Sequence, residues 1–379
     1  MPKRVLIITP NFPPVNKVSS LRGYYLARAF ANRGWDVEVL ASSGNGEDQS
    51  LVREVSGFSI TRTQDGLRWG VIQTILTLFY KRCKRSNEQI NVVISTYGPS
   101  SSHVLGFFVK LLHHPCVWVA DYRDLWCSGS YYGRELRGPI SSIIVPFVER
   151  FLVKFSDFVV TVSSGLASNL SRFLGREVSV VYNGYESFIE NIPQSHAHVG
   201  HLQICYTGTI YRERNPALLL ETISELEEAG DIPKGIVRVV VAGRIDGDLQ
   251  EELSRFVERE LLIYKGFLSR EDSYAIQCSS DYCLIAEDYQ ATKKGVVTGK
   301  VFEYIGSKKP IIALGVAPDS ELADIINRAG LLAYCGQDKS DLAQFIRRAV
   351  SGICYKPNDE FISNFEREKQ TMHFVDIVS

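Results

Sequence analysis

Three basic side chains follow glycine turns in the C-terminal half of the chain. Arg212 and Arg214 come after the turn at Gly208, and Lys300 comes directly after Gly299. An arginine fork binds phosphate oxygens in pairs, and a helix that begins at such a turn adds partial positive charge. Two arginines near one turn are more often ordinary surface residues. The second turn, with its lysine at a helix start, favours a site for a diphosphate.

A carboxylate lies one helical turn beyond that lysine, at Glu303. In this position it can accept hydrogen bonds from two vicinal hydroxyls, as carboxylates do with ribose. The segment from Thr298 to Glu303 lacks the G-x4-G-K-[ST] spacing of a P-loop, and the first strand–helix turn lacks G-x-G-x-x-G. The pattern therefore predicts a nucleotide-diphosphate seat of another kind.

Charged side chains also end an apolar run in the N-terminal half. Asp121, Arg123 and Asp124 follow the strand predicted over 116–120. Catalytic and binding groups lie at the carboxyl ends of parallel strands, which modestly favours a functional role. The alternative is an Arg123–Asp124 ion pair, with Asp121 as a helix cap. His103 follows another predicted strand and by itself is more typical of a polar residue at a helix start than of a base.

The acidic residues and cysteines give little sign of a metal site. Asp246-Gly247-Asp248 resembles triplets that bind Mg²⁺ through nucleotide phosphates, but its position favours a helix cap. Asp281 and Asp288 flank a predicted strand, where capping or solvation explains them. None of the eight cysteines forms a C-x2-C pair, so we predict neither a zinc site nor a disulfide framework.

Two successive series of strands and helices position these residues. Apolar runs that alternate with helical patterns predict parallel sheets covered by helices on both faces. A polar stretch over 191–200 separates the series, so we expect two tandem α/β lobes with a hinge near residue 195 and the active site in the cleft between them. The predicted strands are 5–8, 37–40, 92–95, 116–120, 158–161 and 178–181, then 202–206, 237–241, 261–264, 282–285 and 310–314.

Composition and charge exclude several classes of protein. The chain has 379 residues, of which 45% are hydrophobic and 22% are charged, as in a globular protein rather than a disordered or coiled-coil one. Residues 1–190 contain 21 Lys and Arg against 15 Asp and Glu, and the remainder contains 21 against 28. The excess of basic over acidic residues in 1–190 is too small and too dispersed to indicate nucleic-acid binding.

Membrane contact is expected to be peripheral. The most apolar stretch, 140–162, is interrupted by four charged residues, and the N-terminal apolar run is too short for a signal peptide. These observations predict a cytoplasmic protein. The basic cluster 81–85 follows an apolar helical pattern over 71–79, which suits contact with an anionic membrane. A core-facing helix with a solvated end is the more frequent explanation.

Six segments occur along the chain in a characteristic order and spacing. They are Pro13-Pro14 with Arg22, Asp121-Tyr122-Arg123-Asp124-Leu125-Trp126, Val162-Ser163-Ser164, Val181-Tyr182-Asn183-Gly184, Tyr206-Thr207-Gly208-Thr209 and Gly299-Lys300-Val301-Phe302-Glu303-Tyr304. Taken together, these segments resemble the GT-B glycosyltransferases, and within them the retaining family 4, and the likeness covers nearly the whole chain.

The resemblance implies two Rossmann-like lobes with separate substrates. An acceptor lobe is expected over 1–190, completed by a C-terminal helix within about 357–379, and a nucleotide-sugar donor lobe over 200–356. The acceptor-side residues would be His103, Asp121, Arg123 and Asp124. The donor-binding residues would be Gly208, Thr209, Arg212, Arg214, Thr298, Gly299, Lys300 and Glu303.

The sequence departs from the family pattern at two positions. Thr209 stands where many members have a phosphate-binding Arg, while Arg214 occupies the position of the family's Lys and Arg212 would compensate. Glu303 matches the second Glu of the Glu-x7-Glu motif, but the first, which usually contacts the donor sugar, falls on Gly295. The sequence therefore does not specify the identity of the donor sugar.

The function that the resemblance implies is transfer of a sugar from a UDP- or GDP-sugar to a saccharide or lipid-linked saccharide, in bacterial surface polysaccharide synthesis. Neither metal nor cofactor is expected. Arg214 and Lys300 would stabilise the leaving diphosphate, and either the departing phosphate or Asp121 would take the acceptor proton. The alternatives are a nucleotide-sugar 2-epimerase of the same fold and a non-catalytic nucleotide-sugar binding protein, which the changes at Gly295 and Thr209 motivate.

Overall fold

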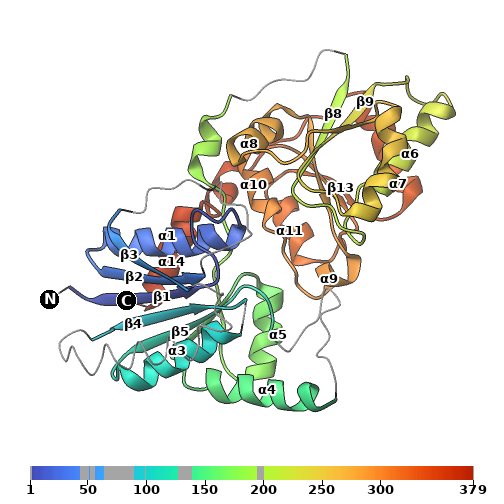
Figure 1. Ribbon diagram of the computed structural model, residues 1–379. Coiled ribbons are helices and arrows are strands. Elements are labelled where there is room, and N and C mark those ends of the chain that lie inside the picture. The colour runs from blue at the N-terminus through green and yellow to red at the C-terminus, as the bar shows by residue number, and fades with distance from the viewer. Residues whose placement is uncertain are drawn as a thin grey trace. The chain divides into compact units, whose positions relative to one another are not determined.

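The computed structural model describes residues 2–42, 51, 56–63, 89–98, 100–126, 139–193 and 200–378. The chain divides into two compact units (Figure 1). Unit 1 comprises Met1–Asn183 and Arg367–Ser379, and unit 2 comprises Gly184–Glu366. The predicted basic cluster 81–85, the apolar pattern 71–79 and residues 194–199 of the predicted linker lie outside the described residues.

Unit 1 is built on a seven-stranded parallel sheet of order β3-β2-β1-β4-β5-β6-β7. The six strands predicted from apolar runs are confirmed to within two residues at each end, and β3, at the edge, was not predicted. The strands are β1 (Arg4–Thr9), β2 (Asp36–Ser42), β3 (Phe58–Thr63), β4 (Val92–Thr96), β5 (Val117–Tyr122), β6 (Phe158–Thr161) and β7 (Ser179–Val180).

Helices cover both faces of this sheet because both faces are apolar. Val5 and Ile7 of β1 pack among residues of α1 (Val18–Asn32) and α14 (Arg367–Val378), while the alternate residues Leu6 and Ile8 pack on the other side. That second side is covered by α3 (Ser101–Leu112), α4 (Pro139–Val153) and α5 (Ser164–Leu174). The C-terminal helix α14 thus completes unit 1.

Unit 2 repeats the arrangement with six parallel strands in the order β10-β9-β8-β11-β12-β13. In both units the chain order reverses beside the first strand, and such a switch point is where ligands bind in open α/β sheets. The strands are β8 (Leu202–Thr207), β9 (Val237–Ala242), β10 (Leu262–Tyr264), β11 (Tyr282–Ala286), β12 (Ile311–Leu314) and β13 (Leu332–Gly336), of which only β13 was not predicted.

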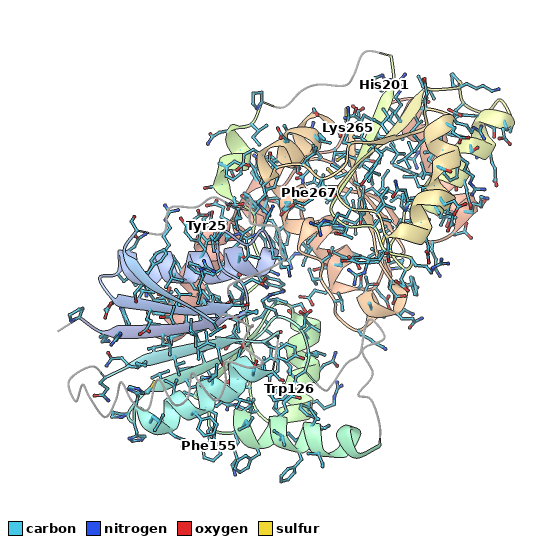
Figure 2. All side chains as sticks on the ribbon, viewed as in Figure 1. Tyr25, Trp126, Phe155, His201, Lys265 and Phe267 are labelled. Atoms are coloured by element: carbon cyan, nitrogen blue, oxygen red, sulfur yellow. The ribbon has the colours of Figure 1, made fainter. Side chains whose placement is uncertain are left out.

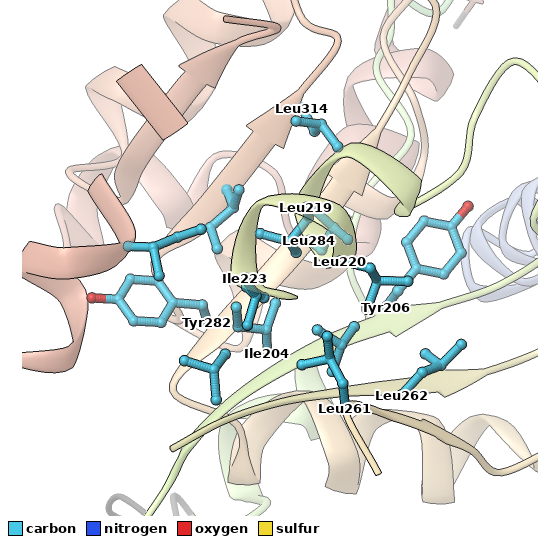
Figure 3. Close-up of a cluster of buried hydrophobic side chains, with 14 of the residues drawn as sticks. Ile204, Tyr206, Leu219, Leu220, Ile223, Leu261, Leu262, Tyr282, Leu284 and Leu314 are labelled. Atoms are coloured by element: carbon cyan, nitrogen blue, oxygen red, sulfur yellow. The ribbon is translucent and has the colours of Figure 1, made fainter. Parts of the chain in front are cut away.

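Successive side chains of β8 face opposite sides of the unit 2 sheet and contact different helices. Tyr206 packs with Leu219 and Leu220 in the core shown in Figure 3. The next residue, Thr207, faces the other way and is bonded to Gln277 and Tyr304. The helices are α6 (Ala217–Glu228), α7 (Gly247–Glu258), α8 (Arg270–Ser279), α9 (Tyr289–Lys293), α10 (Lys300–Gly306), α11 (Glu321–Arg328), α12 (Lys339–Val350) and α13 (Asp359–Ser363), with a 3-10 turn, η1, at Ser187–Asn191.

Candidate functional site

A tight glycine turn at the end of β8 forms the floor of the site in unit 2. Gly208 has a φ of +118°, a conformation that L side chains rarely adopt. A Cβ atom there would lie 2.7 Å from Cε of Lys300, so the lysine side chain lies directly against the turn. Directly after the neighbouring strand β9, a Cβ at Gly243 would lie 2.0 Å from the carbonyl oxygen of Gly208. Both glycines are therefore required for this close packing.

The ammonium group of Lys300 is held by an aromatic side chain of β8. Its Nζ donates to the hydroxyl of Tyr206 at 2.5 Å and lies 3.8 Å from the centroid of that ring. The hydroxyl in turn donates to the carbonyl oxygen of Thr209 at 2.9 Å. Burial lowers the pKa of Lys300 to about 8, which the negative charge of Glu287 opposes and the positive charge of Arg214 reinforces. The lysine is thus a mainly protonated group at neutral pH.

A buried carboxylate, Glu287, pairs with one cation of the site, Arg214, and interacts electrostatically with the other, Lys300. It follows β11, and its Oε2 is 3.1 Å from Nε of Arg214 with a side chain only 2% exposed. Burial raises the pKa of Glu287, while Arg214, Lys300 and a hydrogen bond from Thr298 oppose the rise. Glu287 was not among the predicted site residues, although its place directly after a predicted strand was a usable signal. Of the acids around this strand, the pattern had drawn attention only to Asp281 and Asp288.

The turn after β8 does not bring both of its arginines into this cluster. Arg212 is 67% exposed, and its Nη2 lies 3.9 Å from Oδ2 of Asp248 on the surface. Asp246 caps α7, which confirms the interpretation of that triplet as a helix cap. Lys300, Arg214 and Glu287 therefore form the compact group, with Thr298 bonded to its acid and Gly299 at the start of α10.

Glu303, predicted to bind ribose, belongs to a second network. Its Oε1 accepts from Nη2 of Arg270 at 3.0 Å, and the same guanidinium lies 3.2 Å from Oε2 of Glu186. The hydroxyl of Tyr274 is 3.4 Å from both carboxylates. Burial lowers the pKa of Arg270, but Tyr274 and the two acids more than offset it, so the net pKa is raised. Arg270 and Glu186 gave no motif in the sequence.

In unit 1, Asp121 forms a buried two-pronged ion pair with Arg22. The distances are 2.9 Å from Nε to Oδ2 and 2.7 Å from Nη2 to Oδ1, and Thr96 donates to Oδ2 at 3.1 Å. Asp121 is fully buried and Arg22 is 6% exposed. This geometry gives Asp121 a structural partner rather than the helix-cap role weighed from sequence. Its assignment as a catalytic base stays a prediction.

His103 lies beside Asp121 in a buried aromatic environment. Its Nδ1 is 2.8 Å from Oγ of Ser95, and its ring centroid is 4.6 Å from that of Tyr122. Trp126, labelled in Figure 2, is 6.3 Å from the same ring. Burial lowers the pKa of His103 to about 3, which the charge of Asp121 only partly opposes, so the imidazole is neutral.

The remaining acceptor-side residues are nearer the solvent. Arg123 lies 3.9 Å from Asp124 between Nη2 and Oδ2, and the side chain of Asp124 is 69% exposed. Across the described residues, no three His, Cys, Asp or Glu side chains gather in a way that would hold a metal ion. Within the same residues, no helix combines the length and apolar character needed to cross a membrane.

Several solved structures share this architecture over almost their whole length. Sucrose-phosphate synthase from Thermosynechococcus elongatus superposes with a TM-score of 0.72 at 15% identity, covering 99% of this chain and 98% of that one. A glycosyltransferase from Rickettsia africae ESF-5 gives 0.71 at 12%, covering 100% and 98%. The lipopolysaccharide outer core galactosyltransferase WaaB gives 0.66 at 13%, covering 99% of both. At these identities the likeness establishes the fold, which is GT-B with two Rossmann-like units.

A comparison with family models matches the N-terminal part of the chain. Residues 23–187 match the model of Glycosyltransferase Family 4. This match covers less than half of the chain, and together with the fold it supports a GT-B glycosyltransferase similar to family 4. A comparison with curated proteins found no match.

Proposed function

We propose that this glycosyltransferase transfers a sugar from a UDP- or GDP-sugar to a saccharide or lipid-linked saccharide, with retention of the anomeric configuration. The observation that carries the proposal is the cluster of Lys300, Arg214 and Glu287 against the Gly208 turn, at the switch point of the unit 2 sheet. Retention is supported by the resemblance to family 4.

Two cations would stabilise the leaving diphosphate. Negative charge develops on the diphosphate as the glycosidic bond breaks, and Lys300 and Arg214 supply positive charge from a partly buried position. A well-placed donor of this kind contributes about 2–4 kcal/mol to transition-state stabilisation. Because side chains supply the charge, we propose a reaction that needs no metal. The exposed Arg212 would add a contact from the solvent side of the turn.

The nucleoside would be held by Glu303, whose carboxylate Arg270 keeps in place. Ribose hydroxyls would donate to this carboxylate, as the sequence pattern predicted. On the acceptor side, Asp121 is already bonded to Arg22, so we assign proton uptake to the departing phosphate. His103, Arg123 and Asp124 stay predictions for acceptor binding.

The biological setting that we propose is bacterial surface polysaccharide synthesis at the cytoplasmic face of the membrane. It is supported by the fold shared with a lipopolysaccharide outer core galactosyltransferase. A protein with no membrane-spanning helix among its described residues would meet a lipid-linked acceptor by peripheral association.

A thermal-shift series with UDP, GDP, ADP, dTDP and CMP, in EDTA and in Mg²⁺, tests the donor site. A ligand at about 100 times its dissociation constant stabilises the folded state by about 2.7 kcal/mol, a shift of a few degrees. We expect one nucleoside diphosphate to raise the melting temperature in EDTA. A shift that requires Mg²⁺ would overturn the metal-independent mechanism.

Release of that nucleoside diphosphate from its sugar conjugates tests transfer. Release that depends on an acceptor indicates a transferase. An epimerase or a binding protein shows no acceptor-dependent release of the nucleoside diphosphate. As a site test, Glu303→Ala should weaken nucleotide binding about tenfold or more, since it removes a charged hydrogen-bond acceptor. Unchanged nucleotide affinity in this variant would remove Glu303 from the ribose site.

A further inference from the structure

Helix α4 and the residues directly after it present an apolar stripe to solvent. The stripe recurs every three or four residues, the spacing of one helix face, while the opposite side of the helix packs into unit 1 through Leu152 and Val153. Its members and their exposed fractions are Ile144 52%, Phe147 71%, Val148 36%, Phe151 51% and Phe155 40%.

Helix α3 extends this stripe into a surface. Leu111 at the end of α3 is 53% exposed, and the ring of Phe107 lies 5.2 Å from Phe155 and 6.3 Å from Phe151 between centroids. Phe155 lies on the side of α3 and α4 that faces away from the sheet (Figure 2). Of the eleven large exposed hydrophobic side chains in the described part of the chain, six lie here. We call these six, Leu111, Ile144, Phe147, Val148, Phe151 and Phe155, the α3–α4 face.

Basic residues outnumber acids next to this face. Residues 139–176 contain four cations, and Lys154 and Arg172 among them are exposed. The acids from 139 to 177 are Glu149, which is fully buried, Asp157, which pairs with Lys110 at 2.7 Å, and Glu177, which is exposed. The whole of unit 1 contains 23 Lys and Arg against 15 Asp and Glu, a net charge of +8.

We propose that the α3–α4 face docks on an anionic lipid bilayer. Phenylalanine and aliphatic side chains would enter the boundary between headgroups and acyl chains, and the neighbouring cations would meet lipid phosphates. A second copy of the chain is a poorer occupant, because two units of +8 would repel each other. The inference rests on the proposed function, since a lipid-linked acceptor is what would make the bilayer a useful place to bind.

Sedimentation with lipid vesicles tests the proposal. We expect the protein to sediment with vesicles of equal phosphatidylcholine and phosphatidylglycerol, and weakly with phosphatidylcholine alone. Phe147→Ser/Phe151→Ser should lower the partition coefficient about tenfold or more, because it removes two apolar side chains that are already exposed. Lys154→Glu/Arg172→Glu should lower it on the anionic vesicles only.

The matched control removes exposed apolar side chains elsewhere. Val257→Ser/Met372→Ser, on α7 and α14, should sediment like the unchanged protein. The proposal would be overturned if the Phe147→Ser/Phe151→Ser variant sedimented with vesicles as well as the unchanged protein. It would also be overturned if light scattering showed the unchanged protein to be a dimer and this variant to be a monomer. The nucleotide thermal shift is measured in parallel on each variant. If the protein does not bind vesicles but nucleotide still raises its melting temperature, only this inference is wrong. If nucleotide does not raise the melting temperature, the proposed function is wrong.

Discussion

The ammonium of Lys300 lies 2.5 Å from the hydroxyl oxygen of Tyr206, across a gap of 94 residues in the sequence. The phenol fixes the lysine over the Gly208 turn, and burial keeps the pKa of the lysine near 8 rather than at its ordinary value of 10.5. An incompletely solvated cation that is still charged at neutral pH is well suited to receive a diphosphate.

We expect nucleoside diphosphate binding to weaken as the pH rises above about 8. Lys300 is protonated below its pKa and loses its charge as the pH rises through it, so the affinity should fall by at most about tenfold per pH unit. Lys300→Arg carries a charge that does not titrate and should abolish this dependence. Titration of UDP and GDP by calorimetry from pH 6.5 to about 9.5 provides the measurement. An identical pH profile in Lys300→Arg would assign the titration to another group.

We expect alanine at the two packed glycines to have different effects. At Gly243 the new Cβ would meet backbone 2.0 Å away, so the strand ends must separate, at a cost of several kcal/mol in the free energy of unfolding. At Gly208 it would meet the flexible end of Lys300, and nucleotide affinity should fall more than stability does. Urea midpoints and UDP or GDP titrations separate the two effects.

Gly230→Ala is the control for backbone strain alone. Gly230 has a φ of +78° and nothing within 4 Å of the added Cβ, so a loss of about 1–2 kcal/mol with normal nucleotide binding is expected. If Gly243→Ala destabilises the protein no more than this control does, the two strand ends can separate at little cost.

Glu287→Gln should stabilise the protein without ligand at neutral pH. The pKa of Glu287 is raised by burial, so the ionised form is disfavoured in the folded state, and the neutral amide avoids this penalty. The gain in stability should be absent below the ordinary pKa of glutamate, where Glu287 is protonated in both the folded and the unfolded state. It should grow as the pH rises towards the raised pKa of Glu287 in the folded state. Removing the acid that competes for Arg214 should also enlarge the shift that UDP or GDP produces. Melting curves from pH 4 to about 8 check both effects, and a lower melting temperature at pH 7 would contradict the first.

Asp121→Asn should destabilise unit 1 by about 3–5 kcal/mol, because it leaves the buried guanidinium of Arg22 without its counter-charge. The surface pair Arg33–Asp376 offers the control, and Asp376→Asn should change the free energy of unfolding by about 0–1 kcal/mol. Denaturation midpoints of both variants give the comparison. An Asp121→Asn protein with an unchanged midpoint and no transfer activity would instead identify Asp121 as the catalytic base.

Local patterns in the sequence determined the secondary structure and the fold class. Runs such as Val5–Ile8 and Val237–Val241 form strands because side chains on both faces are buried between helices. The missed edge strands, β3 and β13, lack that signal because they are only half-buried. The glycines at 208 and 299 were likewise visible as turns, and with them the position of Lys300.

Only the tertiary structure decided which charges meet. The order of the parallel strands brings Glu287 to Arg214, Arg270 to Glu303 and Asp121 to Arg22 across 73, 33 and 99 residues. Sequence spacing carries no record of such pairs, since strands that adjoin in the sheet are separated by whole helices in the chain. For the same reason, the apolar stripe of α4 became a surface only when its other side was seen to be buried in the core.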